Sequence, residues 1–322
     1  MKKGKKISAS LIIIIIILIF FLAELVYFLI SLNKKEEKNF TIIVLPDTQG
    51  YAKYPDIFLN QTKWIADNKE KLNIKFVIHE GDIVKDGDAS SSKEQWDVAN
   101  KSFSILEENN IPYSVTTGNH DGDPPYTYYY YYNLYFPVSR FSGKEWYKGY
   151  YKNDTNSIQS LEINGKKFTF ISIEWCPPQE SIEWAKEVLK NYSDTKIILT
   201  THGFLGSNGR QIVHACDAHI TKEIWTNLIN TQKNLQLVLC GHEHPRAGGT
   251  EEARRTDLNV YGQKVYQILA DYQDRENGGN GFLRILEFSQ KENKIYVKTY
   301  SPYTNEYEKD EDSEFVLDYN LR

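Results

Sequence analysis

The sequence predicts a layered α/β domain in which a β-sandwich is flanked by helices. Two observations lead to this prediction: short apolar runs alternate with amphipathic stretches from residue 41 onward, and three strand-like stretches follow one another near the C-terminus. Alternation of strand and helix implies a sheet that is parallel at least in part. With 322 residues, of which 41% are hydrophobic, the chain can bury one substantial core. We therefore expect one folded domain after the first forty residues.

Six apolar runs rich in Val, Ile and Phe are predicted to be buried strands. They cover residues 41–45, 74–78, 113–116, 168–173, 196–200 and 235–239. Apolar residues at helical spacing predict helices over 96–106 and 182–189, and Trp64 and Ile65 lie in a similar segment. The three later strand-like stretches are 267–269, 282–288 and 295–299. We expect these three to extend a second sheet.

The N-terminus predicts a membrane anchor. An apolar run occupies residues 11–30, and these twenty residues would span about 30 Å as a helix. We predict a basic cytoplasmic tail (1–10), a transmembrane signal anchor (11–32), a tether (33–40) and the main domain (41–322). Four lysines precede the run, which favours a single-pass protein of the cell membrane with its domain outside the cytoplasm. A cleaved signal peptide is the alternative, but its apolar region is usually about 7–15 residues long.

Charge and cysteine content exclude some classes of function. The net charge of −5 is spread along the chain without a basic arm, so we expect no specific nucleic-acid binding. The three cysteines, Cys176, Cys216 and Cys240, lack metal-finger spacing and permit at most one disulfide. We favour three buried or isolated thiols. A tyrosine cluster, Tyr126, Tyr128 to Tyr132 and Tyr135, is either a lid over a site or a packed aromatic core.

Residue types that bind metals occur where the predicted strands end. Five such segments are Asp47 to Gln49, Gly81-Asp82, Gly118-Asn119-His120-Asp121, His202-Gly203 and Gly241 to His244. Ligands collect beyond the carboxyl ends of strands in α/β sheets, so these segments should converge. Asp, His and Asn donors suit Mn, Fe or Zn ions. Seven candidate donors exceed the need of one ion, so we predict two divalent transition-metal ions with Asp82 between them.

In their order and positions, these segments resemble the motifs of the calcineurin-like metallophosphoesterases. Later stretches resemble features of a bacterial exported or membrane-anchored subgroup whose first motif is D-x-Q: Asp271-Tyr272-Gln273, Asn277-Gly278-Gly279 and Thr299-Tyr300-Ser301-Pro302. The resemblance covers roughly residues 41 to 302. It implies a four-layer fold, a β-sandwich flanked by helices.

The resemblance also implies a role for each residue. One ion would be held by Asp47, Gln49, Asp82 and His244, and the other by Asp82, Asn119, His202 and His242. Many family members carry His at the position of Gln49, whose amide oxygen is a weaker donor. Gln49 is therefore either a loose ligand or a residue that acts from behind the ligands.

The implied chemistry is hydrolysis of a phosphomonoester or a phosphodiester outside the cytoplasmic membrane. A hydroxide that bridges the two ions would be the nucleophile. His120 would protonate the leaving oxygen, and Asp121 would orient its ring. The alternative is a catalytically inactive surface binding or scaffold protein that keeps the fold. Arg210, His79, His214 and His219 are assigned no role in the chemistry, and the sequence identifies neither the substrate nor a protein partner.

Overall fold

The computed structural model describes residues 9–33, 38–89, 92–122, 129–211, 220–245 and 251–321. The chain divides into two compact units, Met1–Lys38 and Asn39–Arg322. The predicted start of the main domain at residue 41 lies within two residues of this division.

The first unit contains one described helix, α1 (Ala9–Asn33). Its described side chains, those of residues 15–28, are apolar in the main and exposed within the chain itself. Among the residues that the structure describes, no helix reaches the length and apolar character needed to cross a membrane. The anchor predicted over residues 11–32 is therefore not confirmed.

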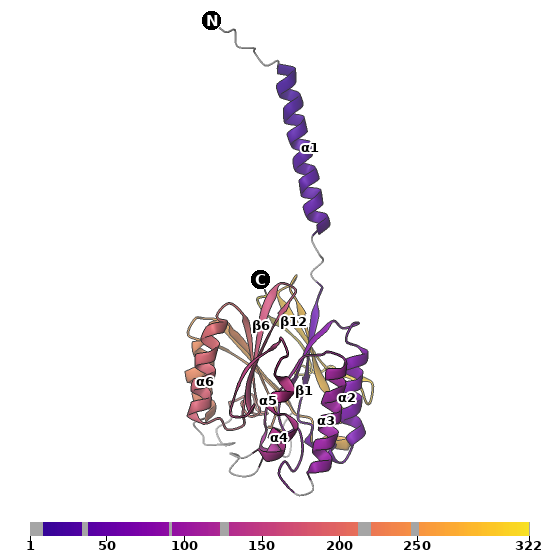
Figure 1. The fold of residues 1–322 in the computed structure, drawn as a ribbon, viewed down its shortest axis with the longest axis vertical. Helices are drawn as coiled ribbons and strands as arrows, with labels where there is room; N and C mark the ends of the chain where they lie inside the picture. The colour runs from indigo at the N-terminus through magenta and orange to yellow at the C-terminus, as the bar shows by residue number, and fades with distance from the viewer. Residues whose placement is uncertain are drawn as a thin grey trace. The chain divides into compact units, whose positions relative to one another are not determined.

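The second unit is built on two sheets (Figure 1). The first has the order β13-β12-β11-β1-β2-β3, and β14 also pairs with β12. Its strands are β1 (Phe40–Leu45), β2 (Ile74–His79), β3 (Tyr113–Val115), β11 (Leu283–Ser289), β12 (Lys294–Ser301), β13 (Glu306–Glu308) and β14 (Glu314–Asp318). Strands β1, β2 and β3 are parallel, and β11 pairs with β1 in the antiparallel sense.

The second sheet has the order β4-β5-β6-β7-β8-β10-β9. Its strands are β4 (Tyr147–Tyr151), β5 (Asn156–Ile163), β6 (Lys166–Ile173), β7 (Lys196–Thr201), β8 (Leu235–Cys240), β9 (Glu252–Leu258) and β10 (Lys264–Ala270). Strands β6, β7, β8 and β10 are parallel. The six predicted strands are all present. The expectation that the three C-terminal stretches share one sheet is wrong, because β10 joins β8 while β11 and β12 pair beside β1.

Side chains of β1 alternate between two cores, which is why its sequence is apolar throughout. Ile43 and Leu45 pack with the helices on the outer face of the first sheet, whereas Ile42 and Val44 face the second sheet. A third core lies between the second sheet and its own helices. The domain therefore has four layers, with α2 and α3 on one side and α6 on the other (Figure 1).

Both segments predicted to be helical from the spacing of their apolar residues, 96–106 and 182–189, form helices in the structure. The helices of this unit are α2 (Pro55–Asp67), α3 (Lys93–Glu108), α4 (Tyr130–Tyr135), α5 (Val138–Phe141), α6 (Gln179–Leu189), α7 (Ile220–Glu223) and α8 (Glu276–Gly279). Short 3-10 turns are η1 (Gln49–Ala52), η2 (Asn119–Asp121), η3 (Lys190–Tyr192) and η5 (Ile229–Thr231), and η4 (Ile224–Leu228) is a π-helical turn.

The tyrosine cluster is mainly an aromatic core where the structure describes it. Tyr129 and Tyr132 are buried in the first core. The ring of Tyr135 stacks on Trp96 with centroids 5.9 Å apart. Tyr126 and Tyr128 lie outside the described residues. The packing interpretation therefore holds for the part that can be seen.

The cysteines differ from the prediction. Cys176 is disulfide-bonded, whereas Cys240 is a buried free thiol. Cys216 lies outside the described residues. The favoured interpretation of three buried or isolated thiols is therefore confirmed for Cys240 and wrong for Cys176. Sequence spacing carries no information on how loops approach one another in space.

Candidate metal centre

The predicted site residues follow the carboxyl ends of parallel strands from both sheets. Asp47, Asp82 and Asn119 come after β1, β2 and β3, and His202 and His242 come after β7 and β8. Parallel strands present their carboxyl ends at one edge, so the two sheets bring these loops to a common place.

The loop after β2 is held by a buried histidine. The backbone N–H of Gly81 donates to Nδ1 of His79 at 3.1 Å, and Nε2 of His79 lies 3.0 Å from the hydroxyl of Thr48. Burial lowers the pKa of His79 to about 3, so its ring is neutral and serves as a structural link. This agrees with its assignment outside the chemistry.

Asp82 follows in a left-handed backbone conformation, with φ of 49°. Its Oδ1 accepts the backbone N–H of His120 at 2.8 Å, and its Oδ2 lies 3.3 Å from Nε2 of His202. Burial opposes ionisation, but the neighbouring His202 and these hydrogen bonds outweigh it and set the pKa of Asp82 at about 2. The carboxylate is therefore charged while buried.

His202 directs its Nε2 toward two carboxylates. Its Nδ1–H donates to the carbonyl oxygen of Glu80 at 2.9 Å, so Nε2 is the ring nitrogen that faces the two carboxylates. This Nε2 is buried without a hydrogen-bond donor among the described residues, 3.3 Å from Oδ2 of Asp82 and 3.9 Å from Oδ2 of Asp47. Burial lowers the pKa of His202, but the nearby charge of Asp82 and the hydrogen bonds of the ring together raise it by a larger amount. The net shift of this pKa is upward. The position between Nε2 of His202 and the carboxylate of Asp82 attracts a proton, and the same position suits a metal cation.

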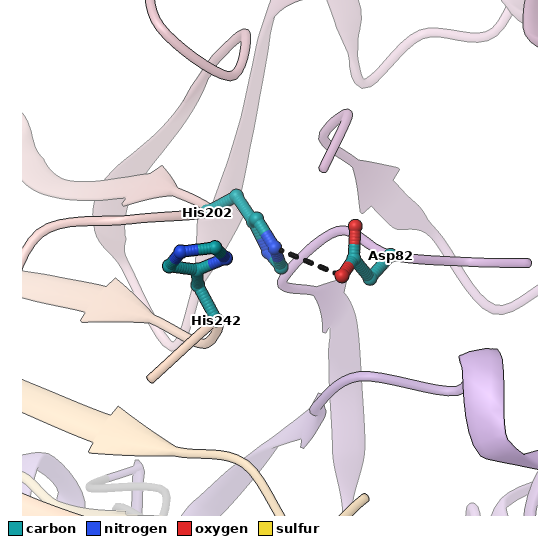
Figure 2. Close-up of side chains that lie close together, drawn as sticks. All are labelled: Asp82, His202 and His242. Carbon is teal, nitrogen blue, oxygen red and sulfur yellow. Dashed lines mark ion pairs between the residues drawn. The ribbon is translucent and has the colours of Figure 1, made fainter. Parts of the chain in front are cut away.

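His242 completes a three-residue cluster with Asp82 and His202 (Figure 2). One ligand atom from each of the three lies within 4.8 Å of the others. Burial and the neighbouring His202 lower the pKa of His242 to about 3, so its ring is neutral and able to donate a lone pair. The ring of Trp175 packs against it with centroids 4.4 Å apart.

The residues of this cluster fit a metal ion. The Oδ1 of Asn119 is buried and has no hydrogen-bond partner in the described structure. Buried polar atoms normally have partners, and Asn119 Oδ1 and His202 Nε2 are both available to a further group. A carboxylate, two neutral imidazoles and an amide oxygen form a donor set that suits Mn, Fe or Zn. These are the four residues that we predicted for one ion.

The residues predicted for the other ion include Asp47 and His244, whose surroundings differ. Asp47 is buried, and both of its oxygens lie 3.3 Å from the backbone nitrogen of His242. Burial and the neighbouring carboxylates of Asp271, Asp82 and Glu80 raise the pKa of Asp47. Nδ1 of His244 lies 2.6 Å from Oδ2 of Asp274, and this contact orients the ring.

Gln49 is oriented with its amide nitrogen toward Asp82. Its Nε2 donates to Asp82 Oδ2 at 2.9 Å and to the side-chain oxygen of Gln273, while its Oε1 accepts from Nζ of Lys85 at 3.3 Å. An amide nitrogen cannot bind a cation, so in this orientation Gln49 supports Asp82 rather than acting as a ligand. Its assignment as a ligand stays a prediction.

Asp121 does not orient the ring of His120 as expected. Its oxygens instead accept three backbone N–H groups, from Ile83 (2.8 Å), Val84 (3.2 Å) and Gly118 (2.7 Å). The Nδ1–H of His120 donates to the carbonyl oxygen of Lys85 at 2.7 Å. The orienting group is thus a backbone carbonyl, and Asp121 ties the loop after β2 to the loop after β3.

Asp271 and Gln273 belong to the site but were not assigned to it. Asp271 directly follows β10, and its carboxylate accepts the backbone and side-chain N–H groups of Gln273. Burial raises the pKa of Asp271 to about 6. The signal that located the other residues, a carboxylate at a strand end, applies to Asp271 as well. His214 and His219 lie outside the described residues.

Known proteins resemble this chain over most of its length. A family model described as calcineurin-like phosphoesterase matches residues 40–246. The protein YvnB of Bacillus subtilis (strain 168) is 37% identical over 268 residues, which are 83% of this chain and 20% of that protein. The chain therefore spans about a fifth of the length of this relative.

Solved structures that align with the chain have low sequence identity to it. The Plasmodium protein GAP50, titled the anchor in the inner membrane complex, aligns with a TM-score of 0.53 and 15% identity over 88% of this chain and 89% of that one. The calcineurin-like phosphoesterase YfkN from Bacillus subtilis aligns with a TM-score of 0.39 and 14% identity over 87% and 88%.

Proposed function

The chain belongs to the calcineurin-like phosphoesterase family, and from this premise we propose that it hydrolyses phosphoester bonds at a centre of two divalent metal ions. The observation that carries the proposal is the pair of buried acceptor atoms, Asn119 Oδ1 and His202 Nε2, beside the charged carboxylate of Asp82. When bound, the ions would activate a water molecule and neutralise the phosphoryl oxygens.

Two ions would share Asp82 as a ligand. Asn119, His202 and His242 would hold one ion together with Asp82, and Asp47 and His244 would hold the other. The buried carboxylates Asp47 and Asp271 repel one another without cations, which supports the second ion. The contacts of His202 with the Glu80 carbonyl and of His244 with Asp274 keep each ring in one orientation.

His120 acts as the general acid. Its Nδ1–H is held by the carbonyl of Lys85, so the proton on Nε2 of the charged ring is the one available for transfer to the leaving oxygen. After the bond between phosphorus and that oxygen breaks, the neutral ring keeps its Nδ1 proton. His120→Asn removes the acid without removing a ligand.

Two measurements test the proposal. Elemental analysis of the fragment beginning at Asn39 should give about two transition-metal ions per chain, with hydrolysis of mono- or bis-(4-nitrophenyl) phosphate that is lost in Asp82→Ala. His120→Asn should lower kcat about 10²-fold or more while metal content stays at two. A metal-free, inactive protein would contradict the proposal and favour a binding or scaffold protein that retains the fold. Equal losses of kcat and metal in His120→Asn would contradict the acid role alone.

We also propose that the domain acts outside the cytoplasmic membrane. The disulfide at Cys176 supports this location, because disulfides persist in oxidising compartments. The apolar run over residues 11–30 would serve as the anchor. Protease added to intact bacteria that express the full chain should digest the domain, and protection until the cells are lysed would contradict the location.

A further inference from the structure

Three side chains form a hydrogen-bonded chain that ends on Asp82. The carboxylate of Asp271 accepts the Nε2–H of Gln273 at 2.8 Å. The side-chain oxygen of Gln273 accepts a hydrogen bond from Nε2 of Gln49, which also donates to Oδ2 of Asp82 at 2.9 Å. Asp271, Gln273 and Gln49 form this amide chain. It joins the loop after β10 to the carboxylate that both proposed ions share.

The direction of the amide chain is fixed at its two ends. A carboxylate only accepts hydrogen bonds, so Asp271 requires the nitrogen of the Gln273 amide on its side. The oxygen of that amide then faces Gln49, which can meet it only with Nε2. On the other side of Gln49, the ammonium of Lys85, which only donates, lies 3.3 Å from Oε1. A flipped Gln49 amide would set oxygen against oxygen and nitrogen against ammonium.

Packing fixes the backbone beside Gln49. The turn over residues 277–281 has positive φ at every position, between 47° and 126°. This turn presses on the loop after β1, because a Cβ on Gly50 would lie 2.4 Å from the carbonyl oxygen of Gly278. Successive left-handed residues are costly and persist where the surrounding structure holds them. The place of Gln49 is therefore set by packing, and its orientation by the amide chain.

The far end of the amide chain is anchored by Tyr272, which stands between Asp271 and Gln273. Its side chain is buried, and its hydroxyl contacts Glu252 and lies 3.3 Å from the hydroxyl of Thr299. The amide chain is thus supported by the three later stretches noted in the sequence: 271–273, 277–279 and 299–302.

Gln49 supplies one of two contacts that hold the Asp82 carboxylate from opposite ends. Oδ1 accepts the backbone N–H of His120 at 2.8 Å, and Oδ2 accepts the amide of Gln49. A carboxylate held at both oxygens cannot rotate about its last bond, so its lone pairs keep one direction. Groups that orient a ligand in this way raise its affinity for a metal ion.

We propose that Asp271, Gln273 and Gln49 are positioning residues that orient Asp82 and thereby set the affinity of the centre for its ions. The inference rests on the proposed metal centre. In this arrangement Gln49 is not a ligand, because its nitrogen faces Asp82 and its oxygen faces Lys85. Loss of a group that orients a metal ligand typically costs about 10–100-fold in affinity.

The test measures Mn²⁺ binding to the metal-free fragment that begins at Asn39 by isothermal titration calorimetry, which needs no turnover. This fragment contains the whole second compact unit. Gln49→Met and Gln273→Met each remove one amide and keep the length of the side chain. Each should weaken Mn²⁺ binding by about tenfold or more. The double variant should be no weaker than the weaker single variant, because both changes break the same chain.

Gln290→Met is the matched control. Gln290 is buried in the turn between β11 and β12, and its Nε2 donates to the carbonyl oxygen of Asn164 at 3.3 Å. This turn lies at the edge where β1 begins, away from the metal centre, so Mn²⁺ affinity should stay unchanged. Circular dichroism checks folding. If Gln273→Met does not fold, Gln273→Asn, which is one methylene too short to reach Gln49, takes its place.

The possible results separate the amide chain from the metal centre. If Gln49 is itself a ligand, Gln49→Met should bind one ion in place of two, while Gln273→Met should bind Mn²⁺ as the wild type does. That result, or losses that multiply in the double variant, overturns the inference while the metal centre stands. A wild-type fragment that binds no Mn²⁺ overturns the metal centre and the inference with it.

Discussion

The substitution Gly118→Ala tests whether backbone proximity positions Asp82. Gly118 has φ of −107° and ψ of −177°, a conformation that alanine adopts freely, so the change introduces no backbone strain. A Cβ at this position would lie 2.1 Å from Oδ1 of Asp82 and 2.3 Å from its backbone nitrogen. Real Cβ contacts are essentially never shorter than 3.0 Å, so Asp82 or the loop must move by roughly 1 Å.

A displacement of this size should be visible in both metal binding and turnover. A misplacement of about 1 Å can cost about 10²-fold in rate. We expect Gly118→Ala to lower kcat/KM for a nitrophenyl ester by about 10²-fold and to reduce metal content below two ions per chain. Elemental analysis, steady-state kinetics and circular dichroism of the same preparations measure metal content, turnover and folding.

Gly149→Ala is the matched control. Its Cβ would meet only Cγ2 of Ile158 at 3.5 Å, an ordinary contact, and β4 lies at the edge of the second sheet. This variant should keep wild-type kinetics and metal content. If Gly118→Ala is folded, holds two ions and stays within twofold of the wild-type kcat/KM, then the contact between Gly118 and Asp82 does not position the carboxylate.

Three further predictions concern stability. Asp121→Asn replaces one oxygen that accepts backbone N–H groups with a donor, so we expect the free energy of unfolding in urea to fall by about 2 kcal/mol, with an unchanged m-value. Burial raises the pKa of Asp154 from 3.8 to about 7, so the folded state retains a proton that the unfolded state releases. The stability of the wild type relative to Asp154→Asn should therefore fall by about 2 kcal/mol between pH 5 and pH 7. Cys176→Ser should lower stability by about 2–4 kcal/mol and abolish any effect of reductant on the unfolding midpoint.

Each of these has a clear contrary outcome. Wild-type stability in Asp121→Asn would show that the three N–H groups find other acceptors. Parallel pH profiles for the wild type and Asp154→Asn would mean that this carboxyl group has an ordinary pKa. A reductant effect that persists in Cys176→Ser would place the sensitive group elsewhere.

The four-layer arrangement was predictable because the information for it is local. Apolar runs such as 41–45 and helical spacing such as 96–106 determine which faces must be buried, and alternation of the two predicts the layers. The pairing of β11 beside β1, rather than in a sheet with β10, was not predictable. Strand partners are chosen by contacts between residues more than two hundred positions apart, and periodicity carries no information about such pairs.

By itself, the sequence determined which residue types meet at the strand ends, and therefore the kind of metal centre that Asp82, His202 and His242 can form. Only the tertiary structure decided what each polar group touches: Asp121 holds backbone N–H groups, a carbonyl of Lys85 orients His120, and Gln49 turns its amide nitrogen to Asp82. The physical reason is the distance along the chain over which each feature is determined. Strand ends follow from local pattern, whereas a hydrogen-bond partner within about 3 Å depends on how separate loops pack together.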